Sequence, residues 1–266
     1  KTVLAAVKEV VGPRLTVGAG MGRHFIPALE QIGREQGITE RTELMRTGWV
    51  KLNGEWIYCT PGGTVGELPP GYTVVLPKEL QTAAPFKVRD DGDGAFKKAL
   101  DGIYSLLGAF DEPIIYPAFA FALCAVAEPF LPGGHKFAMH FVGETGSLKT
   151  STAKVIQALF GLPVEAPPLQ TWRSTVNAIE VTGHSLPNVV GVVDDYKPSI
   201  VPAWEFTQLI QRYADGNARV RLNNQAQIRS RQAMRWWLLS TGEDLPGGEA
   251  SVHARMITVR FPRRPL

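Results

Sequence analysis

From about residue 137 onward, short apolar segments alternate with segments of helical periodicity, and this pattern constrains the fold more than any other feature. Alternation of strands with helices requires crossover connections, so the sequence predicts an α/β fold with a mainly parallel, buried sheet. The expected strands are Phe137–Val142, Val189–Asp194, Trp236–Ser240 and Met256–Phe261, with helices near Lys149–Phe160, Ser174–Thr182 and Ala203–Tyr213.

The first ninety residues have a different pattern, which predicts a small α+β module. Apolar residues recur at helical spacing over Thr2–Val11 and Phe25–Glu35, and a strand is expected over Tyr72–Leu76. The segment Trp49–Tyr58 predicts a hairpin, because its central Asn53-Gly54 tolerates positive φ at both turn positions.

A linker-like composition at Asp90–Gly94 separates this module from the rest of the chain. Two helices, Phe96–Ala109 and Pro113–Val126, are expected before the first strand of the α/β part. The predicted organisation is therefore an N-terminal module at residues 1–94 and a core at residues 95–266.

Composition excludes several classes of protein. The two cysteines, Cys59 and Cys124, lack metal-ligand spacing, which is typical of a reduced, cytoplasmic protein. The longest apolar stretch, Ile114–Ala127, is shorter than the roughly 20 residues that span a bilayer and contains Pro117, so no membrane partner is expected. Because the chain starts at Lys1, we expect it to be a piece of a longer protein.

The first expected strand runs directly into a glycine-containing loop that opens a helix, and this context predicts a phosphate-binding loop. A helix N-terminus offers unpaired N–H donors and partial positive charge to phosphate groups. In this interpretation Lys149 binds the β and γ phosphates of ATP, and the hydroxyl of Thr150 binds Mg²⁺. The loop consists of Gly143, Glu144, Thr145, Gly146, Ser147, Leu148, Lys149, Thr150 and Ser151.

Leu148 departs from the usual pattern, which places glycine immediately before the lysine. Here a glycine stands two residues earlier, at Gly146. The departure is compatible with a differently wound loop and with a loop that binds nucleotide but turns it over poorly. By itself, the segment is also compatible with an ordinary strand-to-helix turn that carries a surface Lys-Thr pair.

An acidic pair ends the next expected strand. Adjacent carboxylates at Asp194 and Asp195 are costly unless they face solvent or a cation, so we expect Asp194 to hold Mg²⁺ and Asp195 to activate the attacking water. Thr241 and Glu243 come after a third strand at the same sheet edge, where Thr241 would contact the water or phosphate and Glu243 would share the role of Asp195. The alternative interpretation is that these residues are only polar turns that follow two strands.

Positive charge is concentrated between Arg212 and Arg235, where six arginines face a single acid, Asp215. These arginines are compatible with contacts to nucleic-acid phosphates. They are equally compatible with a solvated surface or a subunit interface. The candidate nucleic-acid ligands are Arg219, Arg221, Arg229 and Arg231.

Taken together, these segments resemble the helicase-like P-loop ATPases of the AAA+ class found in primase-helicase and replication proteins of phages and mobile elements. The resemblance covers residues from about 100 to 264. It is carried by the segments Phe141–Ser151, Val192–Pro198, Gly216–Arg221, Leu239–Pro246 and Ser251–Arg255.

The resemblance implies a five-stranded core, nucleotide bound between neighbouring subunits of a homo-oligomeric ring such as a hexamer, and motor activity on single-stranded or forked DNA. It implies that Arg255 reaches the nucleotide of a neighbour. It also implies a helical lid, which this sequence does not show after Phe261.

The residues and the resemblance support two functional hypotheses. The first is an ATP-hydrolysing DNA helicase or translocase, with ATP and ADP as ligands and Mg²⁺ as cofactor. The second is a nucleotide-dependent assembly switch or scaffold with little hydrolysis, which Leu148 favours. A small-molecule kinase is a weaker third, because the sequence shows no acceptor site or lid.

Overall fold

The computed structural model describes residues 22–35, 41–60, 63–75, 93–131, 136–161, 168–216, 233–247 and 250–263. The helix expected at Thr2–Val11 and the arginines at 219, 221, 229 and 231 lie outside these residues. The chain forms two compact units, Lys1–Glu43 with Pro69–Thr73, and Leu44–Leu68 with Val74–Leu266. These units divide the chain elsewhere than between residues 94 and 95, so the module 1–94 stays a prediction.

In the smaller unit, helix α2 (Gly22–Glu35) contains the helix expected over Phe25–Glu35. The short strands β1 (Thr42–Leu44) and β5 (Tyr72–Val74) pair as a two-stranded sheet, and the division between the units passes through both strands. The strand expected at Tyr72–Leu76 is therefore confirmed in its first residues.

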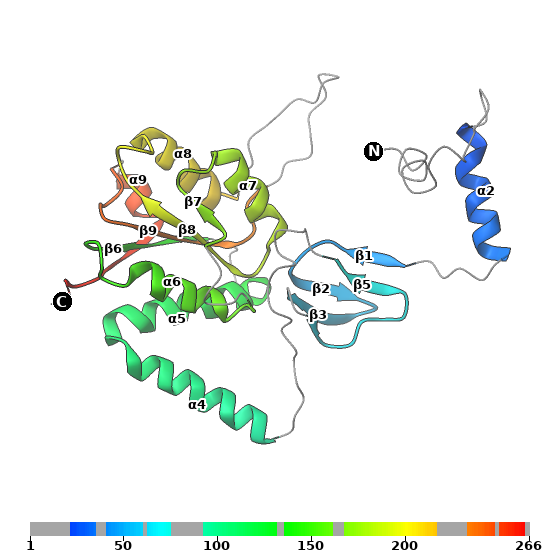
Figure 1. Cartoon of the computed structure of the whole chain (residues 1–266), viewed down its shortest axis with the longest axis horizontal. Helices are drawn as coiled ribbons and strands as arrows, with labels where there is room; N and C mark the ends of the chain where they lie inside the picture. The colour runs from blue at the N-terminus through cyan, green and yellow to red at the C-terminus, as the bar shows by residue number, and fades with distance from the viewer. Residues whose placement is uncertain are drawn as a thin grey trace. The chain divides into compact units, whose positions relative to one another are not determined.

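The larger unit is built on a five-stranded parallel sheet with the order β10-β6-β9-β8-β7, which confirms the predicted α/β fold. Figure 1 shows α5 and α6 on one face of this sheet and α7 and α8 on the other. The strands are β6 (Ala138–Val142), β7 (Gln170–Thr171), β8 (Val190–Tyr196), β9 (Trp237–Gly242) and β10 (Met256–Arg260), and the helices are α4 (Asp93–Ala109), α5 (Glu112–Ala127), α6 (Lys149–Ala158), α7 (Val176–Ser185), α8 (Ala203–Ala214) and α9 (Ala250–His253).

Strand β9 lies between β6 and β8, although it comes after both in the sequence. Its register pairs Phe141 of β6 with Thr241 and Val193 of β8 with Ser240. The carboxyl ends of all three strands therefore meet at one edge of the sheet, which is where ligands of open α/β sheets bind.

Helix α5 is the most apolar element and forms one wall of the core. Its buried residues include Ile115 and Phe121, and the Phe121 ring packs edge-to-face on Trp237 of β9, with centroids 5.2 Å apart. Together with the 3-10 turn η2 (Glu128–Phe130), the helical segment Glu112–Phe130 is 19 residues long, enough by length and composition alone to cross a bilayer. The expected absence of a membrane partner thus remains a prediction.

The expected hairpin is present and belongs to the larger unit. Strands β2 (Gly48–Leu52) and β3 (Glu55–Thr60) are antiparallel, and β4 (Gly63–Val65) completes a three-stranded sheet. Both turn residues have positive φ, 51° at Asn53 and 91° at Gly54, as the Asn-Gly signal predicts.

This small sheet contacts the turn that precedes β8. The Thr47 hydroxyl donates to the Pro187 carbonyl at 3.0 Å, the Trp49 backbone N–H donates to Asn188 Oδ1 at 3.2 Å, and the Tyr58 hydroxyl donates to the Asn188 carbonyl at 2.7 Å. A Cβ at Gly48 would lie 2.5 Å from the Pro187 carbonyl oxygen, so only glycine permits this approach.

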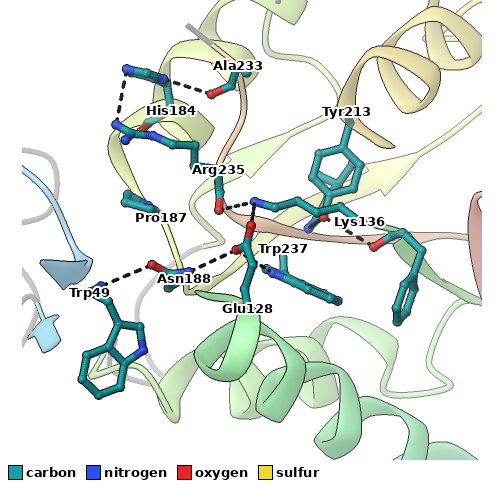
Figure 2. A network of polar contacts seen from close by, with 12 residues as sticks. Trp49, Glu128, Lys136, His184, Pro187, Asn188, Tyr213, Ala233, Arg235 and Trp237 are labelled. Atoms are coloured by element: carbon teal, nitrogen blue, oxygen red, sulfur yellow. Dashed lines mark hydrogen bonds and ion pairs between the residues drawn. The ribbon is translucent and has the colours of Figure 1, made fainter. Parts of the chain in front are cut away.

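One carboxylate, that of Glu128, connects this contact to the parallel sheet (Figure 2). Its Oε2 accepts hydrogen bonds from Asn188 Nδ2 at 3.0 Å and from the Trp237 indole N–H at 3.1 Å. Its Oε1 lies 2.9 Å from the ammonium of Lys136, which precedes β6. Glu128 therefore binds residues at the starts of β6, β8 and β9.

We expect Glu128→Ala to lower the free energy of unfolding by about 3 kcal/mol, because it leaves the buried Lys136 ammonium without its counter-ion and two N–H donors without their acceptor. Glu112→Ala, at the exposed start of α5, is the matched control and should change stability by less than about 0.5 kcal/mol. Urea denaturation of both variants measures the difference, and equal stabilities would contradict the role assigned to Glu128.

Candidate active site

A cleft of about 490 Å³ opens at the carboxyl ends of β6, β8 and β9, next to the start of α6. It brings together most of the predicted loop, both carboxylates of the acidic pair and the two candidate residues after the third expected strand, Thr241 and Glu243. Its lining consists of Thr145, Gly146, Leu148, Lys149, Thr150, Ser151, Thr171, Asp194, Asp195, Thr241, Gly242 and Glu243.

Backbone conformation explains the glycine pattern of the loop. Gly143 packs so closely that a Cβ would lie 2.9 Å from the carbonyl oxygen of Phe261, and Gly146 has a φ of 82°. Leu148 also lies in the left-handed region, at φ 67° and ψ 17°, where it is the N-cap of α6. Glycine adopts this conformation at no steric cost, whereas leucine does so at roughly 1–2 kcal/mol. The loop thus has left-handed backbone at both Gly146 and Leu148, with local strain at Leu148.

Lys149 is almost fully buried, with 8% of its surface exposed, and its ammonium points back into the loop. Nζ donates to the carbonyls of Gly143 and Glu144, each at 2.7 Å, and to the Ser147 hydroxyl at 3.1 Å. Burial lowers the pKa of Lys149, while the carboxylates of Glu243 and Asp194 act in the opposite direction. The ammonium is thus a positive charge held inside the loop by the loop's own carbonyls.

The side chains of Thr150 and Thr241 both contact the carboxylate of Asp194. The Thr150 hydroxyl donates to Asp194 Oδ1 at 2.8 Å, and the Thr241 hydroxyl donates to the same oxygen. The predicted neighbours from the loop and from two strands are therefore in direct contact. A carboxylate with two hydroxyls is a set of hard oxygen ligands of the kind that Mg²⁺ prefers.

Asp195 occupies a bulge, because the pairing of β8 with β9 shifts between Val193 and Tyr196. Its φ of 63° is left-handed, and its backbone N–H donates to the Thr241 hydroxyl at 3.3 Å. The side chain, 36% exposed, forms ion pairs with Lys197 at 3.2 Å and Arg173 at 3.7 Å. The strand continues past the predicted end at Asp194, and the bulge turns the second carboxylate toward the cleft.

Glu243 is placed at the cleft by a contact with the loop, since its carboxylate accepts a hydrogen bond from the Thr145 hydroxyl. The Glu144 carboxylate, one residue earlier in the loop, pairs with Arg263 at 3.0 Å, and both side chains are exposed. The two residues between Gly143 and Gly146 thus connect the loop to neighbouring segments.

Sequence reasoning missed a buried hydrogen-bonded chain beneath the cleft, formed by Trp172, Ser240 and His140. The Trp172 indole N–H donates to Ser240 Oγ at 2.9 Å, and Ser240 Oγ lies 2.9 Å from His140 Nδ1. His140 Nε2 lies 3.1 Å from the carbonyl oxygen of Asp244, which can only accept. The proton is therefore on Nε2, and Nδ1 accepts from Ser240.

A signal for this chain was present in the sequence, because His140 interrupts an otherwise apolar strand. Trp172 and Arg173 gave no comparable signal, since they come directly after β7, which has only two residues, Gln170 and Thr171. Arg173 was accordingly not recognised as a partner of Asp195.

Arg255 is not at this cleft. Its guanidinium donates to Asp215 Oδ1 at 3.1 Å and to the Ser251 carbonyl at 2.9 Å, within the chain. This contact matches the surface ion pair that is the alternative to a role at a neighbour's nucleotide. The role inferred from the resemblance stays a prediction.

The donor set of the cleft fits a magnesium–triphosphate group. Lys149 supplies one positive charge, α6 begins at the loop with its first N–H groups lacking intrahelical acceptors, and Asp194 with Thr150 supplies oxygens for a divalent cation. Among the residues that the structure describes, no group of three or more His, Cys, Asp or Glu side chains forms a separate metal cluster.

Comparison with known proteins finds one matching family model and a solved structure of similar fold. Residues 115–233 match the family model described as a domain of unknown function (DUF927). A solved structure described as SCCmec type IV Cch, an active helicase, superposes with a TM-score of 0.60 at 15% sequence identity, covering 97% of this chain and 48% of that one. This chain therefore spans about half the length of that helicase, and the likeness shows the fold. No significant match is found among curated proteins.

We expect protein stability to depend on His140 between pH 6.5 and 4. Burial lowers the pKa of His140 to about 4, so the unfolded chain is protonated at a higher pH than the folded protein. The unfolded state then binds more protons, and the free energy of unfolding falls by about 3 kcal/mol as the pH drops through this range. In His140→Gln this loss should be absent, and urea denaturation at pH 7 and pH 4 compares the variants. Parallel pH profiles would refute the assignment.

Proposed function

We propose that this chain is the ATP-binding and ATP-hydrolysing core of a DNA helicase or translocase that acts in replication. The observation that carries the proposal is the convergence of the Lys149 ammonium, the Thr150 hydroxyl and the Asp194-Asp195 pair at one cleft. These groups come from the strand–loop–helix unit of β6 and α6 and from β8, which is separated from β6 by β9, and their chemistry matches what phosphoryl transfer to water requires.

Binding of ATP would change the partners of the loop. Lys149 would exchange the carbonyls of Gly143 and Glu144 for phosphate oxygens, which pair with an ammonium more strongly than neutral carbonyls do. The left-handed residues at positions 146 and 148 would let the loop backbone turn its N–H groups toward the phosphates. Thr150 and Asp194 would hold Mg²⁺, which would neutralise phosphate charge.

For hydrolysis, the Asp195 carboxylate would accept a proton from a water molecule. The water oxygen forms a bond to the γ-phosphorus while the bond from that phosphorus to the β–γ bridging oxygen breaks, leaving ADP and phosphate. Asp195 must first loosen its ion pairs with Lys197 and Arg173. Thr241 holds the backbone of Asp195, and Glu243 is the second candidate base.

Action on DNA rests on the likeness to the helicase fold and on the arginine-rich sequence. Arg219, Arg221, Arg229 and Arg231 would contact phosphates of single-stranded or forked DNA. A homo-oligomeric ring would let Arg255 exchange Asp215 for the γ-phosphate of a neighbour, since head-to-tail contacts repeat in a closed ring.

One observation favours the second function, a nucleotide-dependent assembly switch. Leu148 is strained, and Lys149 is satisfied by the loop's own carbonyls, so nucleotide must displace existing hydrogen bonds. A switch of this kind binds ATP with little turnover, and the rate of phosphate release separates the two functions.

Lys149→Ala should reduce ATP affinity at least tenfold, or about 1.4 kcal/mol, because it removes the positive charge of the loop. Titration calorimetry measures the affinity directly. Lys154→Ala, farther along the same helix and away from the cleft, is the matched control and should bind as the unmodified protein does. Unchanged affinity in Lys149→Ala would refute the assignment of the loop.

Asp195→Asn should keep ATP affinity and lower turnover about 100-fold or more, since the amide has the size of the carboxylate but does not accept the proton. Phosphate release under saturating ATP measures this. Normal turnover in Asp195→Asn together with loss in Glu243→Gln would move the role of the base to Glu243.

A further inference from the structure

The three-stranded sheet of β2, β3 and β4 carries an aromatic face far from the cleft residues in sequence. The register pairs Trp49 with Tyr58 and Lys51 with Trp56, so these four side chains share one face. Phe130 of η2 joins them, with its ring centroid 5.5 Å from Trp49 and 5.4 Å from Trp56. We call Trp49, Trp56 and Phe130 the aromatic platform.

The platform leaves large rings in contact with solvent. Trp56 is 43% exposed and Phe130 is 55% exposed. Clustered exposed apolar side chains mark interaction sites, because isolated ones are common but a contiguous group costs solvation free energy.

The rings are also held in fixed positions. The Trp49 indole N–H donates to the Val126 carbonyl at 2.8 Å, and the three rings meet edge-to-face at interplanar angles of 72° to 87°. Edge-to-face packing keeps the rings from stacking on one another, so no ring of the platform covers the face of another. A preformed platform binds with a smaller entropic cost than a flexible one.

Positive charge next to the aromatic platform favours a negatively charged ligand. The Lys51 ammonium lies 5.7 Å from the centre of the Trp56 ring, and Lys51 is the only charged residue on this face among the strand residues that the structure describes. Glu55 pairs with Leu52 and belongs to the opposite face. A second cation, Arg46, donates to the Trp49 carbonyl at 3.3 Å.

We propose that the aromatic platform, with Lys51, is a binding site for single-stranded nucleic acid, in which bases stack on Trp56 and Phe130 and Lys51 pairs with a phosphate. Unpaired bases offer planar faces whatever their sequence, and their phosphates are complementary to a cation beside the rings. The site differs from the arginines at 219 to 231 and does not require ATP hydrolysis.

The test is binding of a fluorescein-labelled 20-nucleotide oligo-dT to the whole chain without nucleotide, measured by anisotropy. Trp56→Leu and Phe130→Leu should each weaken binding at least about fivefold, because they keep apolar bulk but remove the ring face. Trp56→Phe should bind within about twofold of the unmodified protein. Trp204→Leu, at an exposed tryptophan on α8, is the matched control and should have no effect.

Lys51→Ala should reduce the slope of log affinity against log salt by about 0.7, the value for one phosphate contact on a single strand. A duplex of the same length should compete poorly, since its bases are already stacked. The proposal is overturned if Trp56→Leu binds as well as Trp56→Phe, which would indicate an apolar protein-docking surface, or if the duplex competes as well as the single strand.

The outcomes separate this site from the proposed ATPase. Lys149→Ala should bind oligo-dT normally, because the cleft is not part of the platform. If the unmodified protein does not hydrolyse ATP but Trp56→Leu still binds oligo-dT more weakly than it does, the proposed motor function is refuted while the proposed platform is supported. Loss of binding in Trp204→Leu equal to that in Trp56→Leu would instead overturn the platform.

Discussion

The carboxylate of Glu128 is the interaction on which the arrangement of the larger unit depends. It binds Lys136, Asn188 and the Trp237 indole, residues that lie at the starts of β6, β8 and β9. The opposite ends of these strands carry the loop, the acidic pair and Thr241. Only 24% of the Glu128 side chain is exposed, and a charge so largely buried is stable only with such partners. The network therefore holds the starts of all three strands together, and their other ends meet at one cleft.

Much of the fold could be predicted from the sequence, because its signals are local. Strand–helix alternation predicted the parallel sheet, and Asn53-Gly54 predicted the hairpin that the structure contains. The fifth strand, β7, escaped because two residues carry no periodicity. The attachment of the small sheet to the Pro187–Asn188 turn was also not predictable, since it depends on backbone contacts between residues about 140 apart in the sequence.

Some features of the candidate cleft could likewise be predicted from the sequence, and others could not. Residue types and order predicted that Lys149, Thr150 and Asp194 would meet, and the structure places them together. Neither the bulge at Asp195 nor the left-handed backbone at Leu148 has a sequence signal, because both residues adopt a conformation that glycine usually takes. Both strained positions lie at the candidate site, where tertiary contacts rather than local preference decide the conformation.

The close approach of Gly48 to Pro187 restricts which residues of the small sheet can be substituted. Its contacts with the Pro187–Asn188 turn are made by the hydroxyls of Thr47 and Tyr58, by the backbone N–H of Trp49 and by a glycine without space for a side chain, so few substitutions are compatible with them. Lys51 and Trp56, the exposed residues of its aromatic face, carry no such constraint, unlike Trp49 and Tyr58 on the same face. Substitutions at Lys51 and Trp56 would therefore change what this face of the sheet binds without disturbing the contacts with the Pro187–Asn188 turn.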